Sequence, residues 1–474
     1  MNNYQKTIGI EVHCELKTKT KMFSDTLNSY EGSENSHINT IDLAYPGTLP
    51  LINHGAVQLA LKAALLFHCD INKTMSFDRK NYFYPDLPKG YQITQARTPI
   101  GINGYVMIEV QGEKKKVRIH DIHIEEDTAK SIHQVDKSYL DFNRSGVPLI
   151  EIVTEPDMHT EEEAMAYLHK LRELLVYADI SDCKMEEGSM RCDVNVSVSM
   201  NEQLGVRTET KNIGSISSVG KAIKAEAKRQ IEALENGEKI VEETRRFDEK
   251  DEKTILMRVK ETGNDYRYFP EPNIPEFTLT EEEIEEVKQS IPKMPDALRE
   301  EYHELNVNEN NIKTLIAHRE LCSFFEQVKE YDPVITSNLL TGDVLSYLNK
   351  NNLKIKDIKL TKEHMRDIVQ KIHDQEISSK QVKKLLPILM EKGGQVATLM
   401  NELGMVQISD DHALQQLVDQ VIADNPESVE DFKNGKDRAI KYLMGQIMKA
   451  SRGQANPVSV NRLLLDTLNK GDLN

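Results

Sequence analysis

The sequence predicts an α+β protein in which a domain of strands and helices is followed by two all-α domains. Before residue 270, apolar and polar residues alternate in several short segments, as expected for strands with one buried face. Prolines cluster between Pro270 and Pro295, and the chain beyond them shows helical apolar spacing instead. The glycines around 393–404 mark a second joint. We therefore expect domains over 1–293, 294–405 and 406–474.

Composition and charge are those of a globular protein of several domains. The 474 residues are 39% hydrophobic and 29% charged, with a formal net charge of −17. No apolar run is long enough to cross a bilayer, and the first residues lack a signal-peptide layout, so we expect a cytoplasmic location and no membrane contact. The net charge argues against a general nucleic-acid coat but allows local basic patches that hold a specific RNA. The five cysteines are scattered, without a CxxC pair, which argues against a disulfide framework and a cysteine zinc site.

The first predicted strand is GIEVHCELK, near the N-terminus. Its alternation places Ile10 and Val12 on one face and Glu11 and His13 on the other. A single His beside a Glu is usually structural, but three strands with such a polar face would favour a functional site.

A buried helix (AVQLALKAALLF) and then a basic, aromatic loop follow. The loop, 77–94, reads FDRKNYFYPDLPKGYQIT and interleaves Arg79, Lys80 and Lys89 with tyrosines and a phenylalanine. Cations among aromatic rings suit phosphates and stacked bases. A packed loop with lysines reaching to solvent is an equal alternative.

The segment 120–157 contains two strands joined by the turn DFNRSGVP. The first strand ends in three acids, Glu125, Glu126 and Asp127, and the second carries Glu151 between two isoleucines. A carboxylate inside an apolar strand is costly to bury unless a cation pairs with it, and a metal ion would be such a partner. The alternative is a β-hairpin with solvated acids at its rim.

Two helices and a third polar-faced strand complete the predicted sheet domain. One helix begins at Thr160 with the capping-box partner Glu163, and the other spans about 218–235 and ends at Asn236-Gly237. Between them, three valines alternate with polar residues that include Asp193. A group of arginines follows at 243–272, whose anionic partner is either a phosphate or neighbouring carboxylates.

The tail carries a basic run in an otherwise acidic chain. A solvated helix face is the commoner explanation for such a run, but these residues would also suit the phosphate backbone of an RNA. They are Lys436, Arg438, Lys441, Lys449 and Arg452.

The acids on separate strands indicate metal chemistry. Neither a P-loop nor a GxGxxG motif occurs, so any nucleotide would be held through a metal and charged side chains on the sheet. Hard oxygen ligands favour Mg²⁺, while His13 would suit Mn²⁺ better. No cysteine stands in a nucleophile context and no Ser–Ser–Lys arrangement is evident, so the chain has no visible means of releasing ammonia from glutamine.

A series of long motifs resembles, from end to end, the GatB family of the aspartyl/glutamyl-tRNA amidotransferases, which work as GatCAB complexes. The motifs are IGIEVHCELKT, DLAYPGTLP, FDRKNYFYPDLPKGYQIT, HIEEDTAK, LDFNRSGVPLIEIVTEP, KMEEGSMRCDVNVS, DYRYFPEP and MGQIMKASRGQANP.

This resemblance implies an antiparallel-sheet cradle domain related to glutamine synthetase, an all-α helical domain and an all-α YqeY-like tail that binds tRNA. It implies ATP-dependent phosphorylation of Glu on mischarged tRNA(Gln), or Asp on tRNA(Asn), followed by amidation with ammonia from the amidase GatA. It also implies a heterotrimer with the small protein GatC, and it admits the cognate synthetase as a partner. The implied metal ligands are His13, Glu125 and Glu151, with Glu11, Glu126 and Asp193 as nearby catalytic acids. We expect Arg79, Lys80, Arg245, Arg246 and Arg258 to bind the phosphates of ATP.

The sequence departs from the family pattern at two places. Many members hold zinc through paired cysteines, and here the matching positions are Ser24, Thr26, Asn39 and Asp42, so we expect no zinc. The usual FPEPD reads FPEPN, with Asn273 in place of an acid.

Two other functions remain open from the residues alone. One is an amide ligase for a free small molecule, which would leave the basic tail and aromatic loop without a purpose. The other is a tRNA adaptor without catalysis, in which the acids would be solvated. The residues do not distinguish tRNA(Gln) from tRNA(Asn) as the main substrate.

Overall fold

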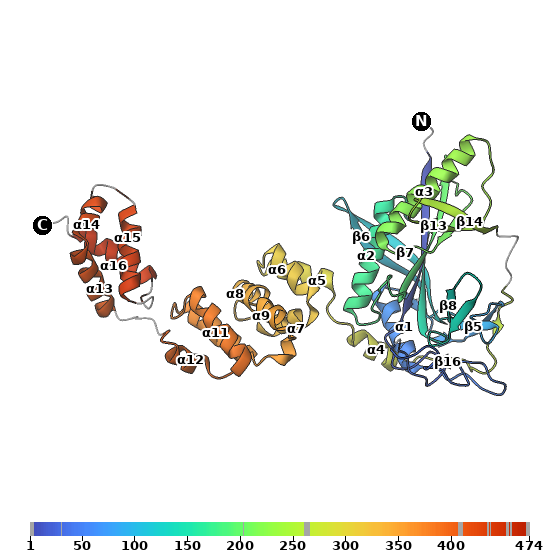
Figure 1. Ribbon diagram of the computed structural model, residues 1–474, viewed down its shortest axis with the longest axis horizontal. Coiled ribbons are helices and arrows are strands. Elements are labelled where there is room, and N and C mark those ends of the chain that lie inside the picture. Colours follow the sequence, from blue (N-terminus) through green and yellow to red (C-terminus); the bar gives the residue numbers. More distant parts are fainter. Residues whose placement is uncertain are drawn as a thin grey trace. The chain divides into compact units, whose positions relative to one another are not determined.

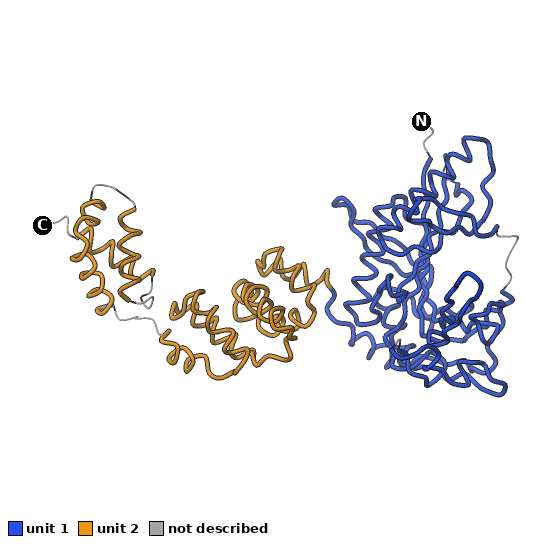
Figure 2. The backbone as a smooth tube through the Cα atoms, viewed as in Figure 1, with its two compact units in different colours: residues 1–294 blue, residues 295–474 orange. Residues whose placement is uncertain are grey.

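The computed structural model describes residues 4–29, 31–201, 203–259, 266–405, 411–433, 436, 438–451, 455 and 457–470. The chain forms two compact units, 1–294 and 295–474 (Figure 2). The mixture of a large sheet with many helices confirms the α+β class in outline. Across the described residues, no helix is both long and apolar enough to span a membrane.

A nine-stranded sheet organises the first unit (Figure 1). Its strand order is β14-β13-β12-β11-β1-β10-β7-β6-β2. The strands are β1 (Gln5–Glu15), β2 (Asp70–Ile71), β6 (Gly101–Val110), β7 (Glu113–Glu126), β10 (Pro148–Thr154), β11 (Met190–Ser199), β12 (Thr208–Lys211), β13 (Glu243–Asp248) and β14 (Lys253–Val259). The first predicted strand, β1, therefore lies at the centre.

The remaining strands of the first unit form three small sheets. One holds β15 (Phe269–Pro270), β4 (Asp78–Asn81) and β5 (Tyr91–Thr94). The others pair β16 (Phe277–Thr278) with β3 (Thr74–Met75), and β8 (Lys130–His133) with β9 (Ser138–Asp141). The basic, aromatic loop thus contributes β4 and β5 rather than irregular chain alone.

One pair in the large sheet is parallel, which the sequence did not predict. β12 pairs with β13 in parallel, and the helix α3 (Ile216–Glu235) lies between them in the chain. Parallel neighbours need such a long crossover because a tight turn can join only antiparallel strands. The predicted end of this helix is confirmed, since Gly237 has a φ of +77° and follows the last turn.

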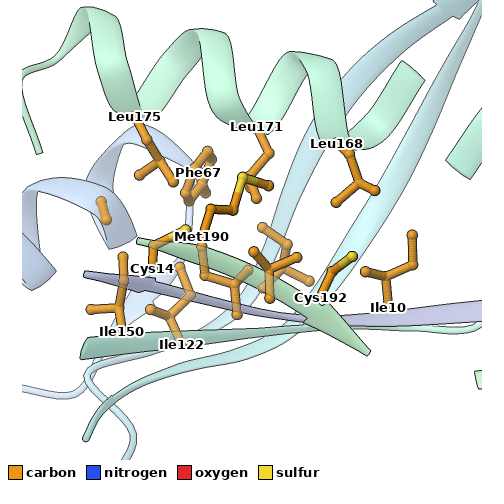
Figure 3. Close-up of a cluster of buried hydrophobic side chains, with 14 of the residues drawn as sticks. Ile10, Cys14, Phe67, Ile122, Ile150, Leu168, Leu171, Leu175, Met190 and Cys192 are labelled. Atoms are coloured by element: carbon orange, nitrogen blue, oxygen red, sulfur yellow. The ribbon is translucent and has the colours of Figure 1, made fainter. Parts of the chain in front are cut away.

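Helices cover one face of the large sheet. α1 (His54–Leu66) and α2 (Glu161–Tyr177) pack with α3 against the apolar side chains of the strands. Figure 3 shows Leu168, Leu171 and Leu175 of α2 directed toward Cys14 and Cys192 of the central strands. The side chain of Thr160 caps α2 by accepting from the backbone N–H of Glu163. The Glu163 carboxylate instead accepts from the backbone of His159, so the capping box is shifted by one residue.

The first unit closes with α4 (Glu281–Gln289), and the described elements of the second unit are all helices. They are α5 (Pro295–Glu304), α6 (Glu309–Ala317), α7 (Arg319–Val328), α8 (Pro333–Leu339), η1 (Leu340–Val344), α9 (Leu345–Asn351), η2 (Ile355–Asp357), α10 (Lys362–His373), α11 (Ser379–Lys392), α12 (Val396–Glu402), α13 (Asp411–Asp424), α14 (Pro426–Lys433), α15 (Arg438–Ala450) and α16 (Pro457–Lys470). The last helices share a core of their own that includes Leu414, Leu443 and Leu464. The boundary between domains predicted at 405/406 stays a prediction.

Candidate functional site

The sheet face opposite the helices carries a row of polar side chains on adjacent strands. The antiparallel register places His13 beside Glu151, and Glu151 in turn beside His123. On the other side of β1, Glu11 is the register partner of Asp193. Because these residues alternate with buried apolar residues of the same strands, their side chains share the face that the helices leave open.

His13, Glu125 and Glu151 form the first cluster. Their ligand atoms lie within 4.8 Å of one another. His13 Nε2 is 3.3 Å from Glu151 Oε2 and 4.0 Å from Glu125 Oε2. Glu125 and Glu151 are only 1% and 8% exposed, so both carboxylates need a cation nearby. Lys80 Nζ, 3.3 Å from Glu125 Oε1, is one such cation.

A second histidine, His123, extends this cluster and was not predicted. Its Nε2 lies 3.0 Å from Glu151 Oε2, and its Nδ1 lies 2.7 Å from Asp121 Oδ1. The signal was present in the sequence, because Asp121, His123 and Glu125 occupy every second position of the strand. The register between β10 and β7 shifts next to Thr154, and such an irregularity changes which residues face the cavity.

In the first cluster, the carboxylates and the imidazole rings shift one another's pKa values. Burial alone would lower the pKa of His123, but Glu151 and Asp121 outweigh it and raise that pKa to about 10. Burial would likewise lower the pKa of His13, and Glu151 and Glu125 raise it above the ordinary value. Burial would raise the pKa of Glu151, but the two histidines hold it well below its ordinary value. Glu151 is therefore an anion between two imidazole rings.

Glu11, Asp193 and Glu209 form the second cluster, again with ligand atoms within 4.8 Å of one another. Asn195 Nδ2 donates to Glu11 Oε1 at 2.9 Å. Lys211 Nζ contacts Asp193 Oδ2 and lies 2.9 Å from Glu209 Oε1. Glu209 and Lys211 were not predicted, although their alternation in the segment TETK could have placed both on one face of a strand.

One cavity of about 1020 Å³ joins the two clusters. Its wall includes Glu11, His13 and Glu151, while Glu125 lines an adjoining cavity of about 470 Å³ that also reaches His13. Both cavities are large enough for a ligand of nucleotide size. The cations on the wall of the larger one are Lys80, Arg207, Lys211 and Arg258.

Glu126, a predicted catalytic acid, is directed elsewhere. Its carboxylate contacts Lys89 Nζ and accepts from the backbone N–H of Ile93 at 2.9 Å. Burial raises the pKa of Glu126 in spite of Lys89. The strand alternation explains why neighbouring Glu125 and Glu126 have different surroundings.

The predicted phosphate-binding cations are not gathered in one place. Lys80 and Arg258 line the cavity. The Arg79 guanidinium instead donates to both carboxylate oxygens of Glu271, at 2.6 and 3.1 Å, and stacks on Tyr91. The backbone N–H of Asn273 donates to the same Glu271 carboxylate, so Asn273 supports this pair through its main chain.

The structure corrects the expectation for Arg245. Its guanidinium donates to Glu243 at 2.7 Å and to Thr254 at 2.9 Å, and lies 3.4 Å from the fully buried Glu226 of α3. Neighbouring carboxylates, not a phosphate, are therefore its anionic partners. Arg246 lies 3.9 Å from Asp248 and is half-exposed.

The basic residues of the tail belong to the second unit. Arg438, Lys441 and Lys449 are exposed on α15, and Lys436 pairs with Asp431 at 2.7 Å. Arg452 lies outside the described residues. The helical spacing places Arg438, Lys441, Gly445 and Lys449 on one stripe of α15.

The positions that match family zinc ligands hold a hydrogen-bond network instead. Ser24 and Thr26 donate to the two carboxylate oxygens of Asp42, each at 2.7 Å, and the backbone of Asn39 donates to Asp42 as well. Hydroxyl groups occupied in this way do not fit the thiolate set that zinc prefers. Asp42 also lies 3.5 Å from Nζ of the fully buried Lys21.

Replacing Asp42 with Asn is expected to destabilise the first unit by about 3 kcal/mol or more, because Lys21 would lose its buried carboxylate partner. Urea unfolding followed by circular dichroism measures this change. The matched control is Asp25→Asn, which removes an exposed carboxylate from the same loop. Equal midpoints for the two variants would contradict a stabilising role of Asp42.

Comparison with known proteins identifies the family. Residues 6–285 match the family model described as "GatB/GatE catalytic domain", and residues 323–468 match "GatB domain". The B subunits of aspartyl/glutamyl-tRNA(Asn/Gln) amidotransferase from Bacillus licheniformis and Staphylococcus carnosus are each 49% identical to this chain, covering 99% of it and all of the relative. The Geobacillus thermodenitrificans protein of that name is 48% identical with the same coverage. The chain therefore belongs to the GatB family of the aspartyl/glutamyl-tRNA(Asn/Gln) amidotransferases.

Proposed function

We propose that this chain is the component of a tRNA-dependent amidotransferase that activates the amino acid on a mischarged tRNA. It would use ATP to phosphorylate the side-chain carboxylate of Glu on tRNA(Gln) or of Asp on tRNA(Asn). Ammonia from a glutaminase partner would then convert the acyl phosphate to the amide. The observation that carries this proposal is the single cavity in which His13, Glu151 and Glu11 lie on one sheet face among cations.

The first chemical step is transfer of the γ-phosphoryl group. An oxygen of the substrate carboxylate attacks the γ-phosphorus, and the bond to the bridging oxygen breaks, leaving ADP and an acyl phosphate. Lys80, Lys211 and Arg258 are the cations that would hold the negative phosphate oxygens at this stage. Lys211 would have to leave Asp193 to do so.

The second step is amide formation. The nitrogen of ammonia attacks the acyl carbon, the C–O bond to phosphate breaks with its electron pair, and one proton is released. Burial and Glu151 raise the pKa of Glu11. Glu11 is therefore a stronger base than a free glutamate and suits acceptance of that proton.

The first cluster fits a divalent ion. One imidazole nitrogen and two buried carboxylates, close enough to share one ion, form a donor set that suits Mg²⁺ or Mn²⁺. Bound there, a divalent ion would neutralise charge on the transferring phosphoryl group. His13, Glu125 and Glu151 would hold it, with His123 fixing the orientation of Glu151 through their hydrogen bond.

Ion binding at the first cluster is expected to release a proton. The raised pKa of His13 favours the protonated ring over a wider pH range than in a free histidine, and a ligand nitrogen must be neutral. The apparent affinity for Mn²⁺ should therefore rise with pH, by up to about tenfold per unit, until the pH exceeds this raised pKa. Calorimetry in two buffers of different ionisation enthalpy measures the proton count. A count of zero at every pH between about 6 and about 8 would contradict a protonated His13 as ligand.

ATP hydrolysis by the assembled complex tests the proposed function. Turnover that requires a mischarged tRNA supports it. Turnover stimulated equally by free glutamate or aspartate would favour a small-molecule amide ligase. No turnover under any condition, together with normal tRNA binding, would favour an adaptor.

The proposed partners are the amidase GatA and the small protein GatC, which would form a heterotrimer with this chain, and the cognate synthetase is a further candidate. Because no glutaminase centre is evident in the sequence, the isolated chain should produce amide from ATP and free ammonia poorly, and from glutamine not at all. Mass spectrometry of the aminoacyl end after each incubation measures both products. Glutamine-dependent amidation by the isolated chain would refute this division of labour.

The proposed domain roles complete the assignment. The cradle over 1–293, related to glutamine synthetase, would perform the chemistry. The helical domain over 294–405 would connect it to a YqeY-like tail over 406–474 that binds tRNA in the cytoplasm. The exposed cations of α15 support the last role.

A further inference from the structure

A buried threonine, Thr244 of β13, lies beside the second cluster. The parallel pairing of β12 with β13 makes Thr244 the register partner of Glu209. The Thr244 hydroxyl donates to Glu209 Oε2 at 2.8 Å, and the two residues are only 2% and 8% exposed. Of the two, Glu209 is among the described residues that line the main cavity. Thr244 therefore acts on the cavity through Glu209.

A bulge in the next strand, β14, places a cation of the cavity level with Thr244. The register between β13 and β14 shifts beside Thr244, and Met257 is the extra residue of β14. Thr254 donates to Glu226 of α3 and so faces the helices. Arg258 is four residues farther along and would face the same way in a regular strand, yet it lines the open cavity. The bulge thus turns Arg258, the register partner of Thr244, toward the site.

The carboxylate of Glu209 has a different partner on each oxygen. Oε2 accepts from Thr244, while Oε1 lies 2.9 Å from Lys211 Nζ. A hydrogen bond at one oxygen fixes the direction in which the other oxygen points. Lys211 also contacts Asp193, which it would have to leave in order to reach a phosphate. Glu209 is then the acid that still holds the Lys211 ammonium group at the cavity.

We propose that Thr244 is a positioning residue for phosphoryl transfer, because it fixes Glu209 and Glu209 keeps Lys211 in place when Lys211 releases Asp193. The inference rests on the proposed function, since it assumes that Lys211 stabilises the transferring phosphoryl group. Displacing a catalytic group by about 1 Å can cost about 100-fold in rate. Charge on the transferring group changes most in the transition state, so loss of Thr244 should lower kcat more than it raises KM.

Variants of Thr244 test the proposal in the full chain assembled with its partner proteins. Thr244→Val removes the hydroxyl at nearly constant volume, and Thr244→Ser keeps it. We expect Thr244→Val to lower kcat for tRNA-dependent ATP turnover at least about tenfold, with the KM for ATP within about threefold of the wild-type value. Thr244→Ser should retain most of the activity. Thr244→Ala, which also lacks the hydroxyl but cannot overfill the site, should show the same loss as Thr244→Val.

A neighbouring threonine provides the matched control. Thr210 of β12 is 1% exposed, and its hydroxyl has no hydrogen-bond partner among the described residues. Thr210→Val therefore makes the same chemical change one strand away and should leave kcat unchanged. A second test uses a Glu209→Gln background, in which Thr244→Val should cause little further loss of kcat if it acts through that carboxylate.

The outcomes separate this proposal from the function on which it rests. Unchanged kcat in Thr244→Val would overturn the positioning role. Equal losses in Thr244→Val and Thr244→Ser, or an equal loss in Thr210→Val, would assign the effect to strand packing and overturn it as well. A full additional loss in the Glu209→Gln background would show that Thr244 does not act through Glu209. A wild-type complex without tRNA-dependent ATP turnover would instead refute the proposed function itself.

Discussion

Replacing Glu151 with Gln should reduce tRNA-dependent ATP turnover at least about 100-fold. Glu151 lies between His13 and His123, at 3.3 and 3.0 Å, and its carboxylate is the only anion directly bonded to both rings among the described contacts. A neutral amide would remove the charge that holds both imidazoles and would leave a poorer ligand for a divalent ion. Changes to groups that merely orient metal ligands already cost about 10- to 100-fold, so loss of a ligand should exceed them.

Two controls distinguish an effect at this site from a general loss of charge or of assembly. Glu109→Gln removes an exposed carboxylate from β6 of the same sheet and should leave turnover unchanged. Glutaminase activity of the amidase partner should persist in the Glu151→Gln complex, which shows that the assembly is intact. Turnover at the wild-type rate with Mg²⁺ would place the phosphoryl-transfer site elsewhere.

The polar face of the sheet was predictable where the alternation was regular. In β1, Ile10, Val12 and Cys14 occupy every second position, so the opposite face with Glu11 and His13 could be identified from the sequence. The same argument holds for the acid of β11, which alternates with valines. The sequence could not show that these strands are neighbours, because register and strand order depend on contacts between distant segments.

The residues whose surroundings the sequence did not predict correctly share a physical explanation. Arg245 looked available for phosphate because its partner Glu226 lies on a helix earlier in the chain, and only the packing of α3 on the sheet brings them together. Glu126 follows Glu125 directly, yet the strand turns the two carboxylates into different surroundings. His123 was overlooked because an extra residue of β7, next to Ile119, interrupts the period of two before the regular alternation of Asp121, His123 and Glu125 begins. Long-range pairing and irregular strands are thus the features that the sequence concealed.

Neutralising the exposed stripe of α15 should weaken tRNA binding strongly and make it less dependent on salt. The variant is Arg438→Gln with Lys441→Gln and Lys449→Gln, three cations that the helical period places on one face. Each phosphate contact contributes roughly one unit to the slope of log affinity against log salt, so the slope should fall by about two to three. Gly445 on the same stripe has no side chain, and an added Cβ there would meet nothing within 4 Å, so the RNA backbone can approach the helix closely.

The control for this prediction is a variant that loses three positive charges from another helix of the second unit. Lys380, Lys383 and Lys384 are exposed on α11, and their replacement by Gln should leave both affinity and salt slope near the wild-type values. Labelled mischarged tRNA is titrated with each complex across a salt series, and the KM for tRNA is measured in parallel with the KM for ATP. The α15 variant should raise only the KM for tRNA, because the nucleotide would bind in the other unit. Equal slopes for the two triple variants would show that the α15 stripe is a solvated surface and that the tRNA is held elsewhere.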